Sequence, residues 1–369
     1  MSRRCVMIMA GGTGGHVFPA LALAQALRQA ACEVVWLGTR RGIEARLVPA
    51  AGIPVEWIAI GGLRGKGFLT LLAAPFALLR ALWQSVAAML RHRPAVVVGL
   101  GGYVTGPGGI AARLTGRPLV IHEQNAVAGF TNRVLARLAT SVLEGFGGGF
   151  GARSRTRIVG NPVRAEFFAL ANPAVRYAAH DGPIRVLVVG GSQGAAALNA
   201  LVPRALAQLH AAEGAAHREL LVRHQCGERH LDRARAAYAT AGIDLSRVTL
   251  SPLIDDIVRA YDWADLVIAR AGALTVAELA AAGVAAVLVP FPAAVDDHQT
   301  ANAKQLVERG AAVLLAERGL TAEALADVLA RLTADRAVLR VMAERARGLA
   351  RPEATRELAD VCLAVGGLT

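Results

Sequence analysis

The sequence predicts an α/β protein built from two similar, doubly wound parallel-sheet domains that face a cleft. The chain has 369 residues, more than the roughly 250–300 residues at which a single hydrophobic core usually stops growing. Its most apolar segments lack polar alternation, which is typical of strands that helices bury on both faces. A strand, a glycine-rich turn and a helix recur in each half. Ligands are therefore expected at the carboxyl ends of two parallel sheets.

Short apolar runs place the predicted strands. The first, Cys5–Ala10, follows Arg3 and Arg4, but its six residues lead into a glycine turn. This pattern favours a buried strand over a signal peptide and gives no indication of secretion. The other predicted strands are Glu33–Leu37, Val96–Val98, Leu119–Ile121, Val186–Val189, Leu266–Ile268 and Ala286–Val289. Helical patterns from Thr321 to the end of the chain complete the prediction.

An internal repeat supports the two-domain reading. The segment CVMIMAGGTGGHVFPALALAQAL, which begins at residue 5, has the same plan as IRVLVVGGSQGAAALNALVPRAL, which begins at residue 184. The glycine cluster 145–151 and the sequence Gly160-Asn161-Pro162 both suit a domain boundary. The predicted domains are 1–160 and 161–350, and the helix expected in 351–369 is predicted to pack back on the first domain.

Composition excludes several classes of protein. Four cysteines without a CxxC pair, and nine histidines without HExxH, argue against a zinc enzyme and fit a reducing compartment. Residues 1–160 hold 18 Lys and Arg against 5 Asp and Glu, whereas the remainder is almost neutral. This asymmetry predicts an anionic partner for the first half: nucleic acid, an anionic membrane surface or a phosphorylated substrate. The alternative is a genomic bias toward arginine.

The segment 62–94 combines apolar and aromatic residues with arginines. Its longest uncharged run, Gly67–Leu79, has 13 residues and contains Pro75, well short of the roughly 20 residues that span a bilayer. Phe68, Phe76 and Trp83 among the basic residues suit an interfacial membrane contact. An ordinary core helix remains the alternative.

Glycine turns follow the first strand of each half. In Gly11-Gly12-Thr13-Gly14-Gly15-His16, Val17 stands where a dinucleotide fingerprint needs glycine, and no acidic residue follows the strand Glu33–Leu37. Hydride transfer with a nicotinamide cofactor is therefore disfavoured. Neither this turn nor Gly190–Gly194 contains GxxxxGK[ST], which excludes a P-loop ATPase. Backbone N–H groups at both turns can meet a diphosphate or a sugar.

Polar residues of the second half have both structural and functional interpretations. Ser192 suits either a contact to a phosphate or the N-cap of a helix. Glu278 stands three residues after Thr275 and suits either a contact to a ribose or a capping box with Thr275. The loop Asp296–Asn302 suits neutral sugar hydroxyls. Its two aspartates have no further clustered ligands, so we predict no metal site.

The motifs together resemble one family, the bacterial lipid II-forming N-acetylglucosaminyltransferases of the family 28 type. GGTGGHVFPALALA, GGYVTGPGG, HEQN, GNPVR, GGSQGA, SPLIDDI, RAGALTVAE and DDHQTANA occur in this order across nearly the whole chain. The resemblance implies the GT-B fold, with two Rossmann-like domains. It also implies an inverting, β-1,4-forming transfer from UDP-N-acetylglucosamine to the MurNAc 4-hydroxyl of lipid I, for peptidoglycan synthesis. The expected location is peripheral, on the cytoplasmic face of the inner membrane, with no cofactor.

The resemblance also implies roles for individual residues. His16 is the expected general base, with Glu123 as the alternative, and a histidine that caps the helix is the structural reading of His16. Ile254 is expected at the uracil, Glu278 at the ribose, and Arg164 and Ser192 at the diphosphate. The remaining residues expected to bind substrate are Thr13, Gly14, Gly15, Asn125, Gln193, Ala273, Leu274, Thr275, Val276, Ala277, His298, Gln299 and Asn302. His298 and Ala271 depart from the family pattern, which has glutamine and serine there in some members.

Two other classes of protein fit parts of the sequence. A UDP-N-acetylglucosamine 2-epimerase can share this architecture but does not need the basic, aromatic segment 62–94. A nucleic-acid-binding protein fits the charge, but no known binding motif is present, and aromatic residues make up only 5% of the chain.

Overall fold

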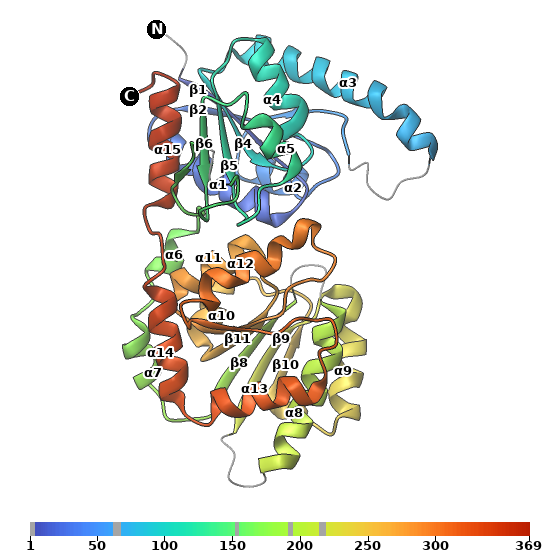
Figure 1. Cartoon of the computed structure of the whole chain (residues 1–369), viewed down its shortest axis with the longest axis vertical. Coiled ribbons are helices and arrows are strands. Elements are labelled where there is room, and N and C mark those ends of the chain that lie inside the picture. The colour runs from blue at the N-terminus through green and yellow to red at the C-terminus, as the bar shows by residue number, and fades with distance from the viewer. Residues whose placement is uncertain (1–3, 62–67, 152–154, 191–194, 214–218) are drawn as a thin grey trace. The chain divides into compact units, whose positions relative to one another are not determined.

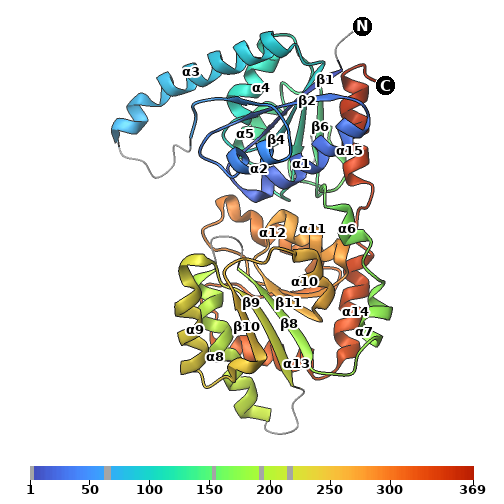
Figure 2. The same ribbon diagram turned by 180° about the vertical axis from the view of Figure 1, so that it is seen from behind.

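The computed structural model describes residues 4–61, 68–151, 155–190, 195–213 and 219–369. The chain divides into two compact units. Unit 1 comprises Met1–Arg164 and Arg351–Thr369, and unit 2 comprises Ala165–Ala350. The C-terminal segment thus returns to the unit that contains the N-terminus, as the colours at the two ends of the chain show in Figures 1 and 2.

Unit 1 is built around a parallel sheet, which has seven strands among the described residues, in the order β3-β2-β1-β4-β5-β6-β7. The strands are β1 (Cys5–Ala10), β2 (Glu33–Gly38), β3 (Val55–Trp57), β4 (Val96–Gly101), β5 (Leu119–Glu123), β6 (Ser141–Glu144) and β7 (Arg157–Ile158). Its helices are α1 (Gly14–Gln29), α2 (Glu44–Ala50), α3 (Phe68–His92), α4 (Thr105–Leu114), α5 (Phe130–Leu135) and α15 (Ala354–Val365).

Successive residues of β1 enter two different cores, because strand side chains alternate between the faces of a sheet. Val6 and Ile8 pack with α1 and α15 on one face. Met7 and Met9 pack with α3 and α4 on the other face. Helices thus bury both faces of the sheet, which explains why its strands are continuously apolar.

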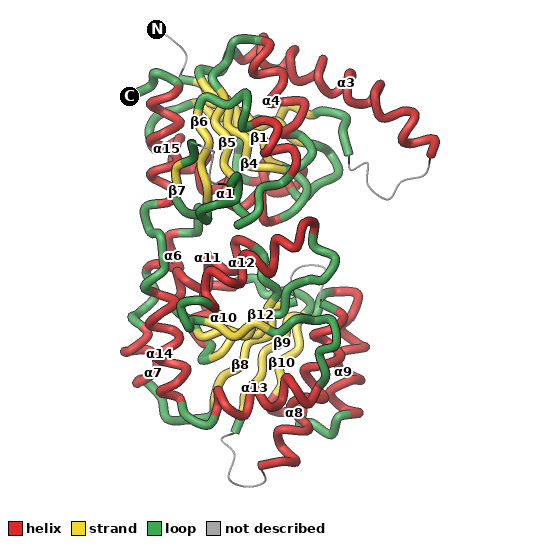
Figure 3. The backbone as a smooth tube through the Cα atoms, viewed as in Figure 1, coloured by secondary structure: helices red, strands yellow, loops and turns green. Residues whose placement is uncertain are grey.

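Unit 2 contains a second parallel sheet, with the order β10-β9-β8-β11-β12-β13 among the described residues. The strands are β8 (Ile184–Val189), β9 (Leu220–Gln225), β10 (Val248–Ser251), β11 (Leu266–Ala269), β12 (Ala285–Leu288) and β13 (Ala312–Leu314). Its helices are α6 (Ala165–Phe168), α7 (Pro173–Ala178), α8 (Ala196–Glu213), α9 (Leu231–Thr240), α10 (Ile257–Trp263), α11 (Ala273–Ala282), α12 (His298–Val307), α13 (Ala322–Thr333) and α14 (Arg336–Arg347). Figure 3 shows this sheet with the helices around it.

Both sheets have the doubly wound strand order. In unit 1 the chain first moves outward from β1 to β3 and then crosses to β4, and in unit 2 it moves from β8 to β10 and crosses to β11. All the strand pairs in both sheets are parallel. The prediction of two parallel-sheet α/β domains is confirmed. The order reverses between β1 and β4 and between β8 and β11, which are the places where such sheets bind ligands.

Helix α3 has one buried face and one exposed face. On its buried face, Ala81, Ala88 and Met89 belong to the core of unit 1. On its exposed face, Phe76 is 77% exposed and Trp83 is 71% exposed. The buried face agrees with the core-helix alternative, whereas the exposed face carries the aromatic side chains that an interfacial contact requires, and that contact stays a prediction. The described helices include none that is long and apolar enough to cross a membrane. Gly62–Gly67, the first part of the segment singled out in the sequence, lies outside the described residues.

Candidate functional site

Two glycine turns meet at the switch point of unit 1. Gly11 and Gly12 directly follow β1. Gly101 is the last residue of β4, and Gly102 is the next residue. A Cβ built on Gly102 would overlap the carbonyl oxygen of Gly11, so only glycine allows the two turns this approach. Gly12 and Gly102 have φ of 91° and 88°, in the left-handed region that also favours glycine. The Trp36 indole N–H donates to the carbonyl of Ala10 (2.9 Å) and fixes the end of β1.

His16 lies at this switch point, in the first turn of α1. A Cβ built on Gly101 would come within 2.8 Å of His16 Nε2, so the imidazole lies against the Gly101 backbone. His16 Nδ1 is 3.4 Å from Thr13 Oγ1. In the tautomer in which Nδ1 carries the proton and faces the hydroxyl, Nε2 carries the lone pair and can accept a proton. The side chain is partly exposed.

The HEQN loop after β5 is held by a buried network. His122 Nε2 donates to the carbonyl of Gly160 (2.9 Å), and His122 Nδ1 accepts from the Gln124 amide (3.1 Å). Burial lowers the pKa of His122, because desolvation disfavours the imidazolium. The Asn161 amide in turn donates to the carbonyl of Gln124 (3.0 Å). His122 is therefore a neutral structural residue.

Glu123, the alternative general base, accepts four hydrogen bonds. Its Oε1 accepts from the backbone and side-chain N–H groups of Asn125, both at 3.0 Å. Its Oε2 accepts from the backbone N–H of Gly129 (3.1 Å) and from the Asn132 amide (2.8 Å). A 3%-exposed carboxylate with both oxygens engaged in this way is suited to orienting Asn125 rather than to taking a proton from a substrate.

The start of α11 forms the corresponding site in unit 2. Gly272 is the N-cap of this helix and offers no side-chain acceptor, so the first N–H groups of the helix are presented at the carboxyl end of β11. Thr275 therefore lies inside the first turn and not at the N-cap. The interpretation of Thr275 and Glu278 as a capping box is wrong for this reason. Glu278 is partly exposed on the second turn, where a carboxylate can reach a ligand.

The predicted loop Asp296–Asn302 is helical from His298 on, where α12 begins, so the loop prediction is wrong for these residues. The segment is anchored to the start of α11. The buried Asn302 donates from its amide to the carbonyl of Ala271 (3.1 Å), directly before α11. Gln299 Oε1 accepts from the backbone N–H of Phe291 (2.9 Å). Asp297 Oδ1 accepts from the Thr300 hydroxyl (2.7 Å). Two predicted sugar-binding residues, Gln299 and Asn302, thus also hold the start of α12 against β12 and α11.

Arg270 is a site-forming residue that sequence reasoning missed. Its guanidinium donates to the carbonyl of Val289 (3.0 Å), forms an ion pair with Glu317 and lies 5.5 Å from the centroid of the Phe291 ring. It joins the carboxyl ends of β11 and β12 beneath the helix starts. The sequence could have indicated this role, because Arg270 directly precedes the segment AGALT, which contains predicted binding residues.

The other predicted binding residues differ in their surroundings. Ile254 lies in the loop between β10 and α10 and is partly buried. Arg164 is exposed at the end of unit 1. Val276 is 1% exposed, so its side chain belongs to the core, and only its backbone is suited to a ligand. Ser192 and Gln193 lie outside the described residues. The remaining predicted residues, Gly14, Gly15, Ala273, Leu274, Ala277 and His298, lie in the first two turns of α1, α11 or α12.

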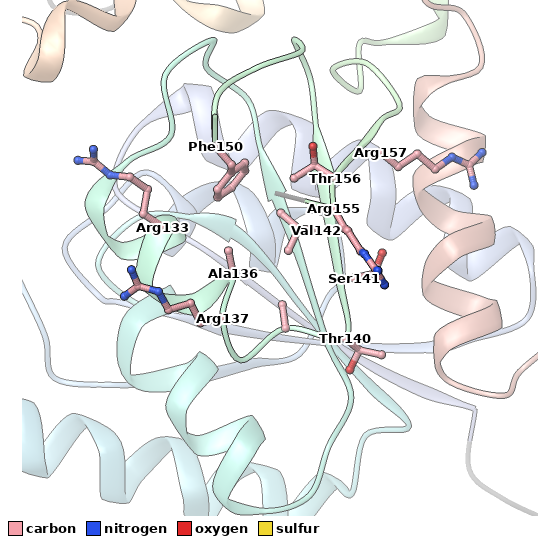
Figure 4. A pocket seen from close by; sticks show the side chains of 11 residues that line it. Arg133, Ala136, Arg137, Thr140, Ser141, Val142, Phe150, Arg155, Thr156 and Arg157 are labelled. Carbon is pink, nitrogen blue, oxygen red and sulfur yellow. The ribbon is translucent and has the colours of Figure 1, made fainter. Parts of the chain in front are cut away.

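A cavity of about 800 Å³ lies elsewhere in unit 1, beside α5 and β6. Figure 4 shows the side chains of Arg133 and Arg137 extending to one side of it and that of Arg157 to the other. Arg157 pairs with Glu357 (2.8 Å), so the guanidinium groups do not converge on one point. None of the predicted site residues is among those that line this cavity.

Acidic, histidine and cysteine side chains do not gather into a group of three that could hold a metal ion anywhere in the described ranges. The described parts of both sites instead present backbone N–H groups, amides, one imidazole and one carboxylate, which suit a sugar and a phosphate ester.

Comparison with known proteins agrees with this site chemistry. Residues 6–144 match the glycosyltransferase family 28 N-terminal domain, and residues 185–358 match its C-terminal domain. A protein of Alkalilimnicola ehrlichii is 58% identical over 97% of this chain and 98% of its own length. One of Burkholderia multivorans is 56% identical over 99% and 97%. Both are named UDP-N-acetylglucosamine–N-acetylmuramyl-(pentapeptide) pyrophosphoryl-undecaprenol N-acetylglucosamine transferase. The crystal structure of MurG from Acinetobacter baumannii is 44% identical, with a TM-score of 0.83 over 98% of this chain and 99% of that one.

The fold and the matched domains define a glycosyltransferase with two parallel-sheet α/β domains, consistent with GT-B. More particularly, the chain belongs to glycosyltransferase family 28. The family resemblance predicted from the ordered motifs is confirmed.

Proposed function

We propose that this chain transfers N-acetylglucosamine from UDP-N-acetylglucosamine to the 4-hydroxyl of MurNAc in lipid I, forming lipid II. The observation that carries the proposal is the 58% identity, over almost the full length of both chains, to a relative that is named for this transfer. The glycine turns of unit 1 and the helix starts at both switch points support the proposal, because they offer the N–H groups that a sugar diphosphate requires.

The donor is assigned to unit 2. The N–H groups at the start of α11, with Ala273, Leu274 and Thr275, face the phosphates or the sugar, and Glu278 accepts hydrogen bonds from the ribose hydroxyls. The backbone of Ile254 meets the edge of the uracil. Gln299 and Asn302, which are anchored on Phe291 and Ala271, complete the sugar site. Ser192, Gln193 and Arg164 are assigned to the diphosphate side.

The acceptor is assigned to unit 1, with His16 as the general base. Thr13 orients the imidazole, and His16 Nε2 takes the proton of the MurNAc 4-hydroxyl as its oxygen attacks the anomeric carbon. The bond from that carbon to the diphosphate breaks, UDP leaves with the electron pair, and the configuration inverts. Hydrogen-bond donors and the dipoles at helix starts stabilise the charge on UDP. Asn125, held by Glu123, is assigned to substrate positioning.

The exposed face of α3 is assigned to an anionic membrane surface. Phe76, Leu79 and Trp83 recur on one side of the helix and are exposed, and Arg80 is exposed beside them. Aromatic and aliphatic side chains with a neighbouring cation suit the lipid headgroup boundary. The proposed location is peripheral, on the cytoplasmic face of the inner membrane, where the enzyme would meet its lipid-linked acceptor.

The test is to incubate the purified chain with labelled UDP-N-acetylglucosamine, with and without lipid I. We expect disaccharide-lipid and UDP in equal amounts, and only when lipid I is present. Formation of the 2-epimer of UDP-N-acetylglucosamine without lipid I would identify an epimerase and contradict the proposal.

A further inference from the structure

Glu44 is a buried carboxylate beneath the first glycine turn. It is the first residue of α2 and is 0% exposed. Its Oε2 accepts from the backbone N–H of Gly12 (3.0 Å). Its Oε1 accepts from the backbone N–H of Thr39 (3.1 Å) and from the Thr39 hydroxyl (2.7 Å). One side chain therefore joins the turn after β1 to the loop after β2.

Three glycines make room for this carboxylate. A Cβ built on Gly11 would lie 2.7 Å from Glu44 Oε1, and one on Gly38 would lie 3.2 Å from Glu44 Cγ. A Cβ on Gly42 would overlap Glu44 Oε2 outright. Segments that lie more than 25 residues apart in the sequence are thus shaped around a single side chain, which is evidence of a specific packing requirement.

The carboxylate has no cationic partner within the described part of the chain, and three N–H or O–H groups alone meet its charge. Burying an ionised group without a counter-ion is costly even when it is hydrogen-bonded. An apolar residue in this position would leave the backbone N–H groups of Gly12 and Thr39 without this acceptor. What the carboxylate specifically provides is a fixed acceptor for the Gly12 N–H.

The Gly12 N–H lies at the point where the turn sets the direction of α1. Gly12 has φ of 91°, Thr13 is the N-cap of α1, and His16 lies one turn further along. A shift at Gly12 therefore moves Thr13 and the His16 imidazole relative to Gly101.

We propose that Glu44 is a positioning residue, which holds the glycine turn so that Thr13 and His16 meet the acceptor hydroxyl. The inference rests on the proposed function, because it takes the turn to be part of the acceptor site. It adds a residue that touches no substrate and acts only through the Gly12 N–H. It also explains why Gly42, which does not belong to the glycine turn, has no side chain.

Glu44→Gln is the direct test, because it replaces one acceptor oxygen by an NH₂ group among three donors. At least one N–H of Gly12 or Thr39 then loses its acceptor. We expect kcat/KM for the lipid-linked acceptor to fall by about tenfold to a hundredfold, the scale on which a small misplacement acts. We expect the Kd for UDP, which unit 2 binds, to stay within about twofold, since no contact to UDP changes. A purely structural role would weaken both.

A double-mutant cycle gives a second, independent test. Gly42→Ala alone should displace the carboxylate and lower acceptor kcat/KM, whereas added to Glu44→Ala it should change little further, because the clash is gone. If Glu44→Gln fails to fold, Thr39→Val carries the test, since it removes one donor and keeps the shape of the side chain. We expect it to lower acceptor kcat/KM by roughly tenfold or less.

Asp265→Asn is the matched control. Asp265 is also a buried carboxylate and accepts from a backbone N–H, that of Arg185 (2.9 Å), but it belongs to unit 2 and, among the described residues, makes no hydrogen bond with the glycine turn after β1. It should lower thermal stability without changing acceptor kcat/KM in the folded protein.

Two results would overturn the inference. The first is that Glu44→Gln keeps the wild-type kcat/KM for the acceptor while His16→Ala is inactive in the same assay. The other is additive losses for Gly42→Ala and Glu44→Ala. If His16→Ala also kept full activity, the assignment of the turn to the acceptor site would fail instead, so the two failures are distinguishable.

Discussion

Two buried histidines, His122 and His224, have a lowered pKa and a definite hydrogen-bonding role. His224 Nε2 donates to Asn199 Oδ1 (2.9 Å), and its Nδ1 accepts from the Tyr238 hydroxyl (3.0 Å). The Asn199 amide donates to the carbonyl of Cys226 (2.9 Å). Desolvation lowers the pKa of His224 to about 4. The network ties α8 and α9 to β9 and is stable only while the imidazole is uncharged.

This network makes stability depend on pH. The folded pKa of His224 lies below the ordinary value of about 6.5, so the unfolded chain binds the proton first, and stability is lost as pH falls from about 6.5 toward 4. His224 contributes up to about 3 kcal/mol to this loss. We expect His224→Gln, measured by urea unfolding at pH 7.5 and pH 5, to reduce the difference between the two. His210→Gln changes an exposed side chain of α8 and should leave this difference in stability unchanged. An equal pH dependence of stability in the wild type and in His224→Gln would contradict the role of His224.

Single residues also show where sequence reasoning stops. His16 and Glu278 were predicted because they belong to ordered motifs. In the structure His16 lies in the first turn of α1, and Glu278 lies in the second turn of α11. Glu44 was not predicted, because a lone glutamate before an apolar helix normally indicates a solvated surface. Its burial depends on Gly11, Gly38 and Gly42, whose approach to one another exists only after folding.

At the scale of elements, the apolar strands β1, β2, β4, β5, β8, β11 and β12 were predictable, whereas the strands β3, β6, β7, β9, β10 and β13 were not predicted. Strands buried on both faces are continuously apolar, which any single sequence reveals. The start of α11 could not be predicted from the sequence, because Thr275 and Glu278 match a capping box and Gly272 has no side chain to mark an N-cap. For the same reason the position of Glu278 on the second turn needed the structure.

Helix α3 carries the prediction that belongs to this scale. Phe76→Ser with Trp83→Ser removes two exposed aromatic side chains without touching the buried face. We expect binding to vesicles of 70% phosphatidylcholine and 30% phosphatidylglycerol, measured by sedimentation, to weaken by about a hundredfold, from roughly tenfold for each ring that enters the interface.

The control for this experiment is Val175→Ser, an exposed apolar residue of unit 2 that is 63% exposed. It should bind the vesicles as the wild type does. Undiminished binding by the double variant would remove α3 from the membrane contact.

On the scale of the whole molecule, the same doubly wound plan is used twice with different site residues. Unit 1 places an imidazole and a glycine turn at its switch point, and unit 2 places a carboxylate and the N–H groups of α11. The C-terminal helix α15 completes unit 1, where Leu358 and Cys362 are buried with α1, and Arg4 donates to the carbonyl of Leu368 (2.7 Å). The proposed acceptor and donor sites therefore belong to two separately packed cores.

This division is tested most directly by steady-state kinetics in which UDP-N-acetylglucosamine and lipid I are varied separately. His16→Ala should lower kcat by about 10²- to 10⁴-fold with little change in the KM for the donor. Glu278→Gln should raise the KM for the donor, with a smaller effect on the KM for lipid I. A His16→Ala enzyme with normal kcat, or a Glu278→Gln enzyme with unchanged KM for the donor, would contradict the account.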